Sequence, residues 1–156
     1  MAKIKKILLI TPPYHTGVVE CAGVWLNVGF VYIAGSLRAA GYDPIYYDAM
    51  SHWHNYDEIG KRIESERPDV VATTAFTAEI VDGLKVLKLA KEINSNIITV
   101  IGNVHPTFCY EEMLKDDSTP VDYIVRGEGE ETMVDLMNVL SSRGDLAKVR
   151  GIAYRD

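Results

Sequence analysis

The sequence predicts a three-layer α/β domain, and three observations support this fold class. Short apolar runs of strand length recur along the chain, the clearest being Ile7 to Ile10 and Ile97 to Ile101. Segments with helical spacing of apolar residues separate these runs. The runs end at corners rich in Gly, Pro and Thr. Unbroken apolar runs are typical of parallel strands buried on both faces, and five alternations of strand and helix favour a parallel sheet covered by helices.

The first strand is expected at residues 7–10, ending at Thr11-Pro12-Pro13, because consecutive prolines continue neither a helix nor a ladder. A connection over about residues 14–28 follows, and loops of this length are usually functional or mobile. The next helix is marked by an apolar stripe at i, i+3, i+4 and i+7 and by a glycine placed to end it; these residues are Phe30, Ile33, Ala34, Leu37 and Gly41.

The second unit has a strand around residues 45–47 and a helix that turns Ile59 and Ile63 inward and stops before Pro68. Between them, His52 and His54 are expected at the surface. The third unit has a strand at residues 70–72 and a helix that Asn94 to Asn96 ends. This helix has an inward stripe and a threonine that could cap it: Ile80, Leu84, Leu87, Ala90 and Thr77.

The fourth unit joins the strand at residues 97–101 to a short helix over roughly residues 107–115. Pro106 suits the first turn of that helix, where its missing N–H is not needed. The fifth strand is expected at residues 123–125, and residues 151–154 could add another short one. The last helix has one apolar face and a terminating glycine, formed by Met133, Leu136, Met137, Leu140 and Gly144.

The 156 residues predict one domain over 1–156, long enough to bury a core. Five units in a chain of this length suit the flavodoxin-like strand order 2-1-3-4-5.

The formal charge of −6 counts against a nucleic-acid partner. No apolar run approaches the roughly 20 residues needed to cross a bilayer. The two cysteines, Cys21 and Cys109, form no Cys-x-x-Cys pair and fit a reducing compartment, so a cytoplasmic protein is expected.

Four strand-exit corners should meet at the carboxyl edge of the sheet, where open α/β domains bind ligands. They are Thr11 to His15, Thr73 to Thr77, Gly102 to Thr107, and Gly127 to Glu130. These corners offer small side chains and neutral hydrogen-bonding groups, which suit a large ligand rich in amides and hydroxyls. A single threonine could merely end a strand or cap a helix, but four converging corners favour a ligand site.

The usual signals of other α/β ligands are missing. The sequence has neither the dinucleotide fingerprint after the first strand nor the P-loop motif. Gly127-x-Gly129 is flanked by Glu128, Glu130 and Glu131, which would repel a pyrophosphate. Thr11-Pro12 and Thr73-Thr74 stand where a receiver domain needs carboxylates. A phosphoacceptor is therefore excluded.

The chain resembles the cobalamin-binding domain at the amino terminus of many radical S-adenosylmethionine enzymes, of the type similar to the anaerobic magnesium-protoporphyrin monomethyl ester cyclase. The resemblance rests on three corners and covers essentially the whole chain: Thr11-Pro12-Pro13-Tyr14, Gly102-Asn103-Val104-His105-Pro106-Thr107 and Arg126-Gly127-Glu128-Gly129-Glu130, with Gly29 to Asp48 between them.

The resemblance implies a flavodoxin-like domain that holds cobalamin at the carboxyl edge of its sheet. The first corner would lie against the corrin, and the others would surround the nucleotide tail or meet the corrin amides. It implies no catalytic residue in this chain. The implied cofactor-binding residues are Thr11, Pro12, Pro13, Tyr14, His15, Thr73, Thr74, Ala75, Phe76, Thr77, Gly102, Asn103, Val104, His105, Pro106, Thr107, Gly127, Glu128, Gly129 and Glu130.

Two departures from the family pattern define the expected role. The Asp-x-His-x-x-Gly motif that supplies a lower cobalt ligand is absent: residues 13–18 hold His15 without the aspartate and the spaced glycine. No metal ligand is therefore expected: His15 is only a weak candidate for cobalt, and its expected place is in a loop near the corrin. His105 could also approach the lower face but is expected to shape its corner. The Cys-x-x-x-Cys-x-x-Cys motif for an iron–sulfur cluster is also absent.

The chain is therefore expected to be the cofactor module of a longer radical enzyme, a methyltransferase or an oxidative cyclase such as one of tetrapyrrole biosynthesis. A C-terminal domain of that enzyme would bind a [4Fe-4S] cluster and S-adenosylmethionine. Two alternatives remain open from the residues. One is a flavin- or nucleotide-binding flavodoxin-like domain. The other is an independent enzyme with His15 or His105 as general base, although no nucleophile lies at a recognisable elbow.

Overall fold

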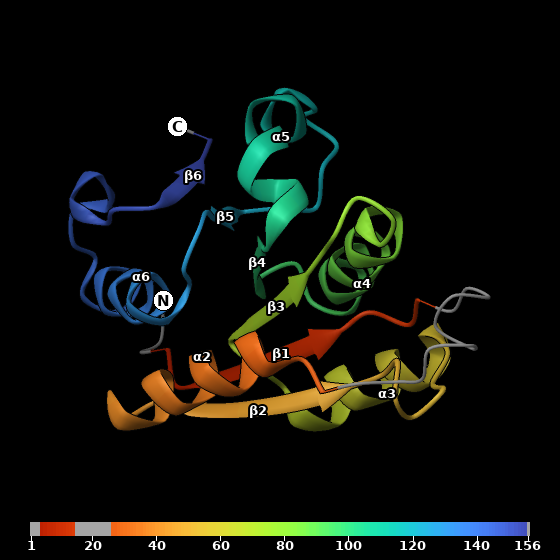
Figure 1. Cartoon of the computed structure of the whole chain (residues 1–156). Coiled ribbons are helices and arrows are strands. Elements are labelled where there is room, and N and C mark those ends of the chain that lie inside the picture. The colour runs from red at the N-terminus through yellow and green to blue at the C-terminus, as the bar shows by residue number, and fades with distance from the viewer. Residues whose placement is uncertain (1–3, 15–25, 156) are drawn as a thin grey trace.

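The computed structural model describes residues 4–14 and 26–155. A six-stranded sheet forms the middle layer, in the order β2-β1-β3-β4-β5-β6. Figure 1 shows α2 and α6 on one side of the sheet and α3, α4 and α5 on the other. The three-layer α/β class and the order 2-1-3-4-5 are confirmed. The suggested last strand is present and pairs antiparallel to β5, while the other pairs are parallel.

The strands and helices follow the predicted alternation. The strands are β1 Lys6–Thr11, β2 Asp43–Asp48, β3 Val70–Thr74, β4 Ile98–Gly102, β5 Tyr123–Val125 and β6 Ile152–Tyr154. The helices are α2 Val28–Ala39, α3 Tyr56–Glu66, α4 Ile80–Ile93, α5 Val104–Lys115 and α6 Glu130–Ser142, with a short 3-10 helix η1 at Leu146–Lys148.

Two separate cores form because successive side chains of a strand point to opposite faces. On one face, Ile7 and Leu9 of β1 pack with Phe30 and Leu37 of α2 and with α6. On the other face, β1 contributes Leu8 and Ile10 to a core shared with α3, α4 and α5. The strands are therefore buried on both sides, as their unbroken apolar runs predict.

Three predicted helix ends differ from the structure. Helix α5 begins at Val104, earlier than predicted, because the Asn103 side chain accepts a hydrogen bond from the Val104 N–H; Pro106 then lies within the first turn. Helix α6 ends on Arg143 in the left-handed conformation, at φ 55°, rather than on Gly144. Thr77 does not cap α4: the capping position is Glu79, which makes no side-chain cap hydrogen bond.

The outer edge of the sheet beside α2 is formed by β2. Its Pro44 lies opposite Ile7 of β1 and gives the strand no amide donor at that point. Arg38 of α2 covers the same place, with Nη2 donating to the carbonyl oxygen of Pro44 at 3.4 Å. Among the residues that the structure describes, no helix is long and apolar enough to span a membrane.

Candidate functional site

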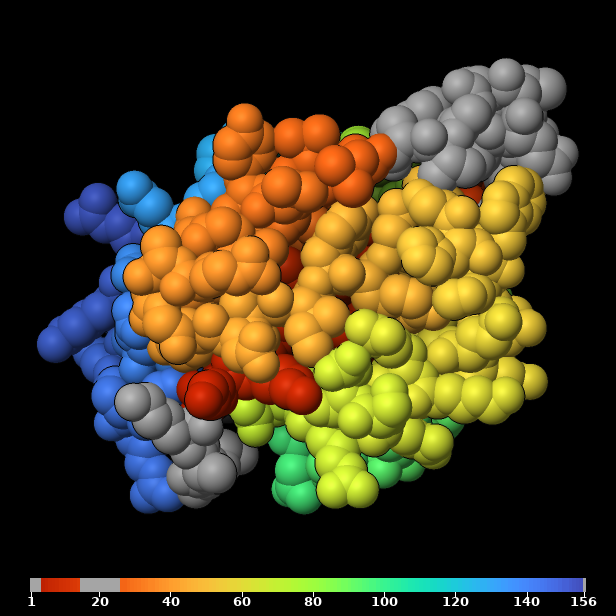
Figure 2. All heavy atoms as spheres, turned by 90° about the horizontal axis from the view of Figure 1, so that it is seen from below, coloured from red at the N-terminus to blue at the C-terminus, as the bar shows by residue number. Residues whose placement is uncertain are grey.

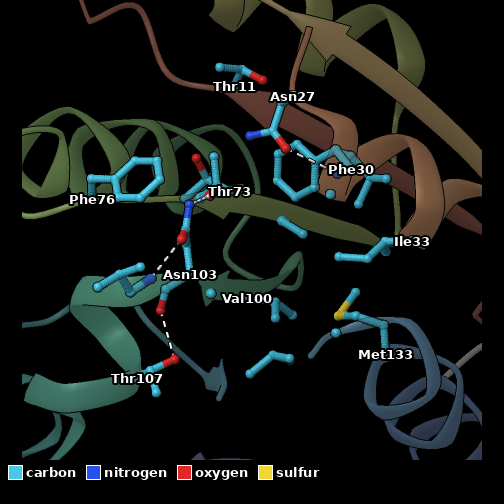
Figure 3. Close-up of a pocket in the computed structure, with 18 of the residues that line it drawn as sticks. Thr11, Asn27, Phe30, Ile33, Thr73, Phe76, Val100, Asn103, Thr107 and Met133 are labelled. Carbon is cyan, nitrogen blue, oxygen red and sulfur yellow. Dashed lines mark hydrogen bonds between the residues drawn. The ribbon is translucent and has the colours of Figure 1, made fainter. Parts of the chain in front are cut away.

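A cavity of about 690 Å³ lies between the sheet, α2 and α6 and opens at the carboxyl edge of the strands. Figure 3 shows side chains from both helices and from the sheet converging on it. Four neighbouring strands form its floor with apolar side chains, and two helices supply its walls. These residues are Leu9, Ala72, Val100 and Val125 from the strands, and Phe30, Ile33 and Met133 from the helices.

Three strand ends are joined at the rim by one chain of hydrogen bonds. Asn103 Nδ2 donates to Thr74 Oγ1 at 2.8 Å, which links the ends of β4 and β3. Thr107 Oγ1 donates to the carbonyl oxygen of Asn103 at 2.7 Å and accepts from the Gly127 N–H at 3.1 Å, which adds the end of β5. These hydrogen bonds tie the ends of β3, β4 and β5 into one rim.

Asn103 has an unusual backbone, with φ 85° and ψ −168°. This region is essentially restricted to glycine, and strain of this kind persists only where surrounding contacts enforce it. Here Asn103 Oδ1 accepts from the Val104 N–H at 2.7 Å while Nδ2 binds Thr74. One amide side chain thus starts α5 and fixes the corner that the sequence predicts as a ligand site.

The start of α2 is tied to the first two strands through Tyr46. The Tyr46 hydroxyl lies 3.2 Å from Thr11 Oγ1 and accepts from the Asn27 N–H at 3.3 Å. Asn27 Oδ1 in turn accepts from the Phe30 N–H at 3.1 Å, as an N-cap does. Burial, the largest cause, raises the pKa of Tyr46, while the hydrogen bonds to Thr11 and Asn27 oppose it. The Tyr46 hydroxyl therefore stays neutral and acts as a hydrogen-bond partner beside the cavity.

The lining of the cavity contains no Lys, Arg or His among the residues that the structure describes. Three carboxylates lie along it: Glu79, Glu128 and Glu130. Glu79 Oε2 accepts from the Phe76 N–H at 3.2 Å. Burial is the main cause that raises the pKa of Glu79; the Phe76 N–H opposes it and nearby Asp82 adds to it. The cavity thus presents an apolar interior with a neutral to acidic rim.

The structure brings most of the predicted site residues together. Those that line the cavity are Thr11, Thr73, Thr74, Phe76, Gly102, Asn103, Val104, Thr107, Gly127, Glu128, Gly129 and Glu130. The Thr73 hydroxyl is already used, since it donates to the carbonyl oxygen of Ile10 at 2.9 Å.

The remaining predicted residues do not line the cavity. The His105 side chain is directed at Thr77, with Nδ1 at 3.3 Å from Thr77 Oγ1. The backbone N–H of His105 donates to the carbonyl oxygen of the fully buried Ala75. Pro106 is buried in the first turn of α5. Pro12, Pro13 and Tyr14 are described but lie outside the lining, and His15 lies outside the described residues.

Sequence reasoning missed two groups of lining residues. The first is the floor of the cavity, because Leu9, Val100 and Val125 read simply as core. The signals available were Ala72, a small residue in a strand of larger ones, and Gly129, at which a Cβ would lie 2.8 Å from Ile33 Cδ1. The second group comprises the start of α2, the wall residues of α2 and α6, and scattered rim positions: Leu26, Asn27, Val28, Gly29, Phe30, Ile33, Met50, Glu79, Phe108 and Met133.

The histidines after β2 do not form part of this site. His52 is exposed, as expected. His54 is only half-exposed, contrary to expectation, because its Nδ1 lies 2.6 Å from the Tyr47 hydroxyl and its ring lies tilted against that of Tyr47, with the ring centroids 5.7 Å apart. In the described part of the chain, no group of three or more His, Cys, Asp or Glu side chains could hold a metal ion.

Comparisons with known proteins agree with this geometry. The chain is 40% identical over 153 residues to the anaerobic magnesium-protoporphyrin IX monomethyl ester cyclase of Rubrivivax gelatinosus, covering 96% of this chain and 27% of that protein. It is 33% identical to an uncharacterized methyltransferase of Pyrococcus horikoshii, covering 99% of this chain and 33% of that protein. The predicted resemblance is confirmed, and the chain spans about a quarter to a third of these curated relatives.

Solved structures show the same fold. The cobalamin-dependent S-adenosylmethionine radical enzyme OxsB, with aqua-cobalamin and S-adenosylmethionine bound, superposes with a TM-score of 0.81 at 21% identity over 99% of this chain and 21% of that one. The radical S-adenosylmethionine methyltransferase TsrM from Kitasatospora setae, with cobalamin and a [4Fe-4S] cluster bound, gives a TM-score of 0.78 at 14% identity, over 100% of this chain and 28% of that one.

The B12 binding domain family matches residues 14–137, which include α2, α3, α4 and α5, most of α6, and every strand from β2 to β5. The cavity lies within the same span except for its contacts with β1. This match covers well over half of the chain. The chain belongs to the B12 binding domain family.

Proposed function

We propose that this chain is the cobalamin-holding module of a larger radical S-adenosylmethionine enzyme, either a methyltransferase or an oxidative, ring-forming cyclase. The observation that carries the proposal is the apolar cavity, which opens at the carboxyl edge and reaches the floor residues Leu9, Ala72 and Val100. The curated relatives are three to four times as long as the matched region, which supports a module within a longer protein.

The residues of the cavity fit the nucleotide tail of cobalamin. That tail ends in a neutral, aromatic benzimidazole, which gains free energy from leaving water for an apolar environment. The cavity offers Phe30, Ile33 and Met133 as walls and contains no cation among the described residues. A volume of about 690 Å³ is within the range of ligand pockets. These side chains would hold the base of the tail.

The rim fits the amide-bearing corrin. Corrin side chains end in primary amides, which both donate and accept hydrogen bonds. Thr74, Asn103 and Thr107 present hydroxyl and amide groups around the cavity mouth, and Glu79 and Glu128 add acceptors. When bound, cobalamin supplies the cobalt redox and alkyl-transfer chemistry, while the protein binds and orients it.

A flavin nucleotide fits the same site less well. Its terminal phosphate would need amide donors after β1, where Pro12 and Pro13 supply none. The carboxylates of Glu79, Glu128 and Glu130 along the cavity would repel this terminal phosphate, a dianion, more strongly than the singly charged phosphodiester of the cobalamin tail. The two prolines are therefore the main argument for cobalamin over a flavin nucleotide.

We also propose that no histidine of this chain coordinates the cobalt. The aspartate that would orient a ligating imidazole is absent before His15. His105 lies outside the cavity lining and has Thr77 as its partner. With the benzimidazole of the tail held in the cavity and no histidine in its place, the bound cofactor would be base-off, without a nitrogen below the cobalt.

The direct test is to mix the purified chain with hydroxocobalamin, remove free cofactor by desalting, and record the absorption spectrum. Retained corrin bands at one equivalent are expected, with no retention of flavin mononucleotide in a parallel sample. Retention of flavin and loss of corrin would reverse the assignment. Paramagnetic resonance of the cobalt(II) form should lack nitrogen superhyperfine splitting. A splitting that disappears in His15→Ala would contradict the proposed lower face.

A further inference from the structure

Helix α2 is apolar on the side that faces away from its core as well as on the side that packs into it. Its inner side buries Phe30, Ala34 and Leu37 against the sheet and α6. Its outer side leaves Val28 at 55%, Val31 at 42% and Tyr32 at 64% of their full exposure. A helix that is hydrophobic all round is normally buried on every side.

The outer residues form one continuous stripe. Val28, Val31, Tyr32, Gly35 and Ala39 follow the i, i+3, i+4, i+7, i+11 spacing of a single helical face. All five are exposed. We call these residues the α2 stripe. Figure 2 shows the side of the molecule on which α2, in orange, lies at the surface.

Helices α3 and α6 do not share this feature. The exposed positions of α3 include Asp57, Lys61 and Glu64, and those of α6 include Glu131 and Asp135. In α2, by contrast, Arg38 is the single charged residue in twelve. The solvent face of an ordinary surface helix is charged or polar, so α3 and α6 behave as such helices and α2 does not.

The stripe joins the mouth of the cavity. Val28 belongs both to the stripe and to the cavity lining, and Leu26, 56% exposed, continues the apolar surface along the rim. Phe76, Val104 and Phe108 extend it across the carboxyl edge, where they are also exposed. A partner seated on the stripe would therefore also reach the open side of the bound cofactor.

Gly35 gives the stripe a flat centre. A Cβ placed on Gly35 would meet nothing within 4 Å, so the glycine is not required by packing inside the domain. In a helix interior glycine is less stable than alanine. An uncovered glycine at this position leaves room for another backbone to approach the helix closely.

We infer that the α2 stripe is the surface on which the radical S-adenosylmethionine domain of the same polypeptide docks. This inference rests on the proposed function. One exposed helix face is small beside the roughly 1,200–2,000 Å² that a stable complex of separate chains buries, so a second copy of this chain fits poorly. A covalently linked domain needs less area, because the link supplies a high effective concentration. Its docking segment should be apolar, with little charge opposite Val31 and Tyr32.

The test uses the whole polypeptide, loaded with cobalamin, with the photo-crosslinker p-benzoylphenylalanine in place of Tyr32. Irradiation, proteolysis and mass spectrometry should identify a link to a segment outside the 156 residues of this chain. A matched sample carries the crosslinker in place of Lys61, on the charged face of α3, and should give no such link. Links confined to the 156 residues, links to a second copy, or equal links from position 61 would overturn the inference.

A double substitution, Val31→Lys with Tyr32→Lys, gives an independent readout. Neither residue lines the cavity, so the 156-residue chain should retain its cobalamin and its unfolding midpoint. In the whole polypeptide, cleavage between the two domains by a dilute protease should become about tenfold faster or more, since two apolar contacts are lost. An unchanged cleavage rate would contradict docking on the stripe. Loss of cobalamin retention by the unsubstituted chain would instead contradict the proposed function.

Discussion

Asn103 and Thr74 join the ends of two neighbouring parallel strands through a single hydrogen bond, from Asn103 Nδ2 to Thr74 Oγ1 at 2.8 Å. The same asparagine accepts the Val104 N–H and carries a backbone conformation that favours glycine. One residue thus combines a helix cap, a strand-to-strand link and local strain at the cavity rim. Substitutions of Asn103 should therefore lower the free energy of unfolding by different amounts, according to which of these three roles they remove.

Replacing Asn103 by alanine should lower the free energy of unfolding by about 1–3 kcal/mol, because the cap and the bond to Thr74 are lost while the strain remains. Asn103→Gly should cost less, since glycine adopts this backbone freely. Urea unfolding measures both. Asn96→Ala, in the exposed turn before β4, is the control and should change little. Equal losses for the alanine and glycine variants would show that strain has no part.

Filling the floor of the cavity should separate binding of the nucleotide tail from binding of the corrin. Ala72→Leu places three extra carbon atoms into the cavity. Cobalamin affinity should fall by at least about tenfold, roughly 1.4 kcal/mol, while affinity for cobinamide, which lacks the nucleotide tail, should change little. Spectroscopic titration of both corrinoids measures this. A parallel loss for cobinamide would place the tail elsewhere, and a thermal melt checks that the variant folds.

Gly129 should be sensitive to a single added methyl group. A Cβ at this position would lie 2.8 Å from Ile33 Cδ1, and Ile33 lines the cavity. Gly129→Ala should push the Ile33 side chain toward the cavity and weaken cobalamin retention, with a stability change below about 1.5 kcal/mol. Gly35→Ala is the matched control in the 156-residue chain: it should raise stability by about 0.5–1 kcal/mol and leave retention unchanged. Equal retention by the two variants would argue against the Ile33 contact.

The raised pKa of Glu79 predicts a pH-dependent stability. Burial, the main cause, makes the folded protein bind a proton more tightly than the unfolded chain, whose Glu pKa is near 4.5. Stability contributed by this group is therefore present at low pH and is lost as pH rises through the folded pKa. Relative to Glu79→Gln, the wild-type protein should lose stability as pH rises from about 4.5 to 7. Urea unfolding of both proteins across this range measures the difference, and a constant difference would contradict the prediction.

The strands and helices could be predicted from the sequence because their physical signals were local, whereas the strand order was inferred from the flavodoxin-like class that five such units suit. The runs at residues 7–10 and 97–101 are apolar without interruption, and Phe30 to Leu37 repeats with helical spacing. The corners followed from the geometry of parallel sheets, which places every strand exit on one edge. The composition of these corners then indicated a large, neutral ligand.

The apolar floor of the cavity could not be predicted from such local signals. Leu9, Val100 and Val125 have the character of core residues, and only the placement of α2 and α6 turns the space above them into a cavity. The capping role of Thr77 was predicted from its position before α4, yet its hydroxyl faces His105 instead. Both outcomes depend on how distant segments pack, which periodicity does not encode.

Pro44 and Arg38 give the domain protection against aggregation. Strand β2 is an open edge, and exposed edges with free amides and carbonyls can recruit strands from other molecules. Near the start of β2, Pro44 has no amide N–H to donate, and its carbonyl oxygen already accepts a hydrogen bond from Arg38. The opposite edge is only the three-residue strand β6. Both edges of the sheet are thus poor templates for strand addition, in a domain that also exposes an apolar cavity mouth.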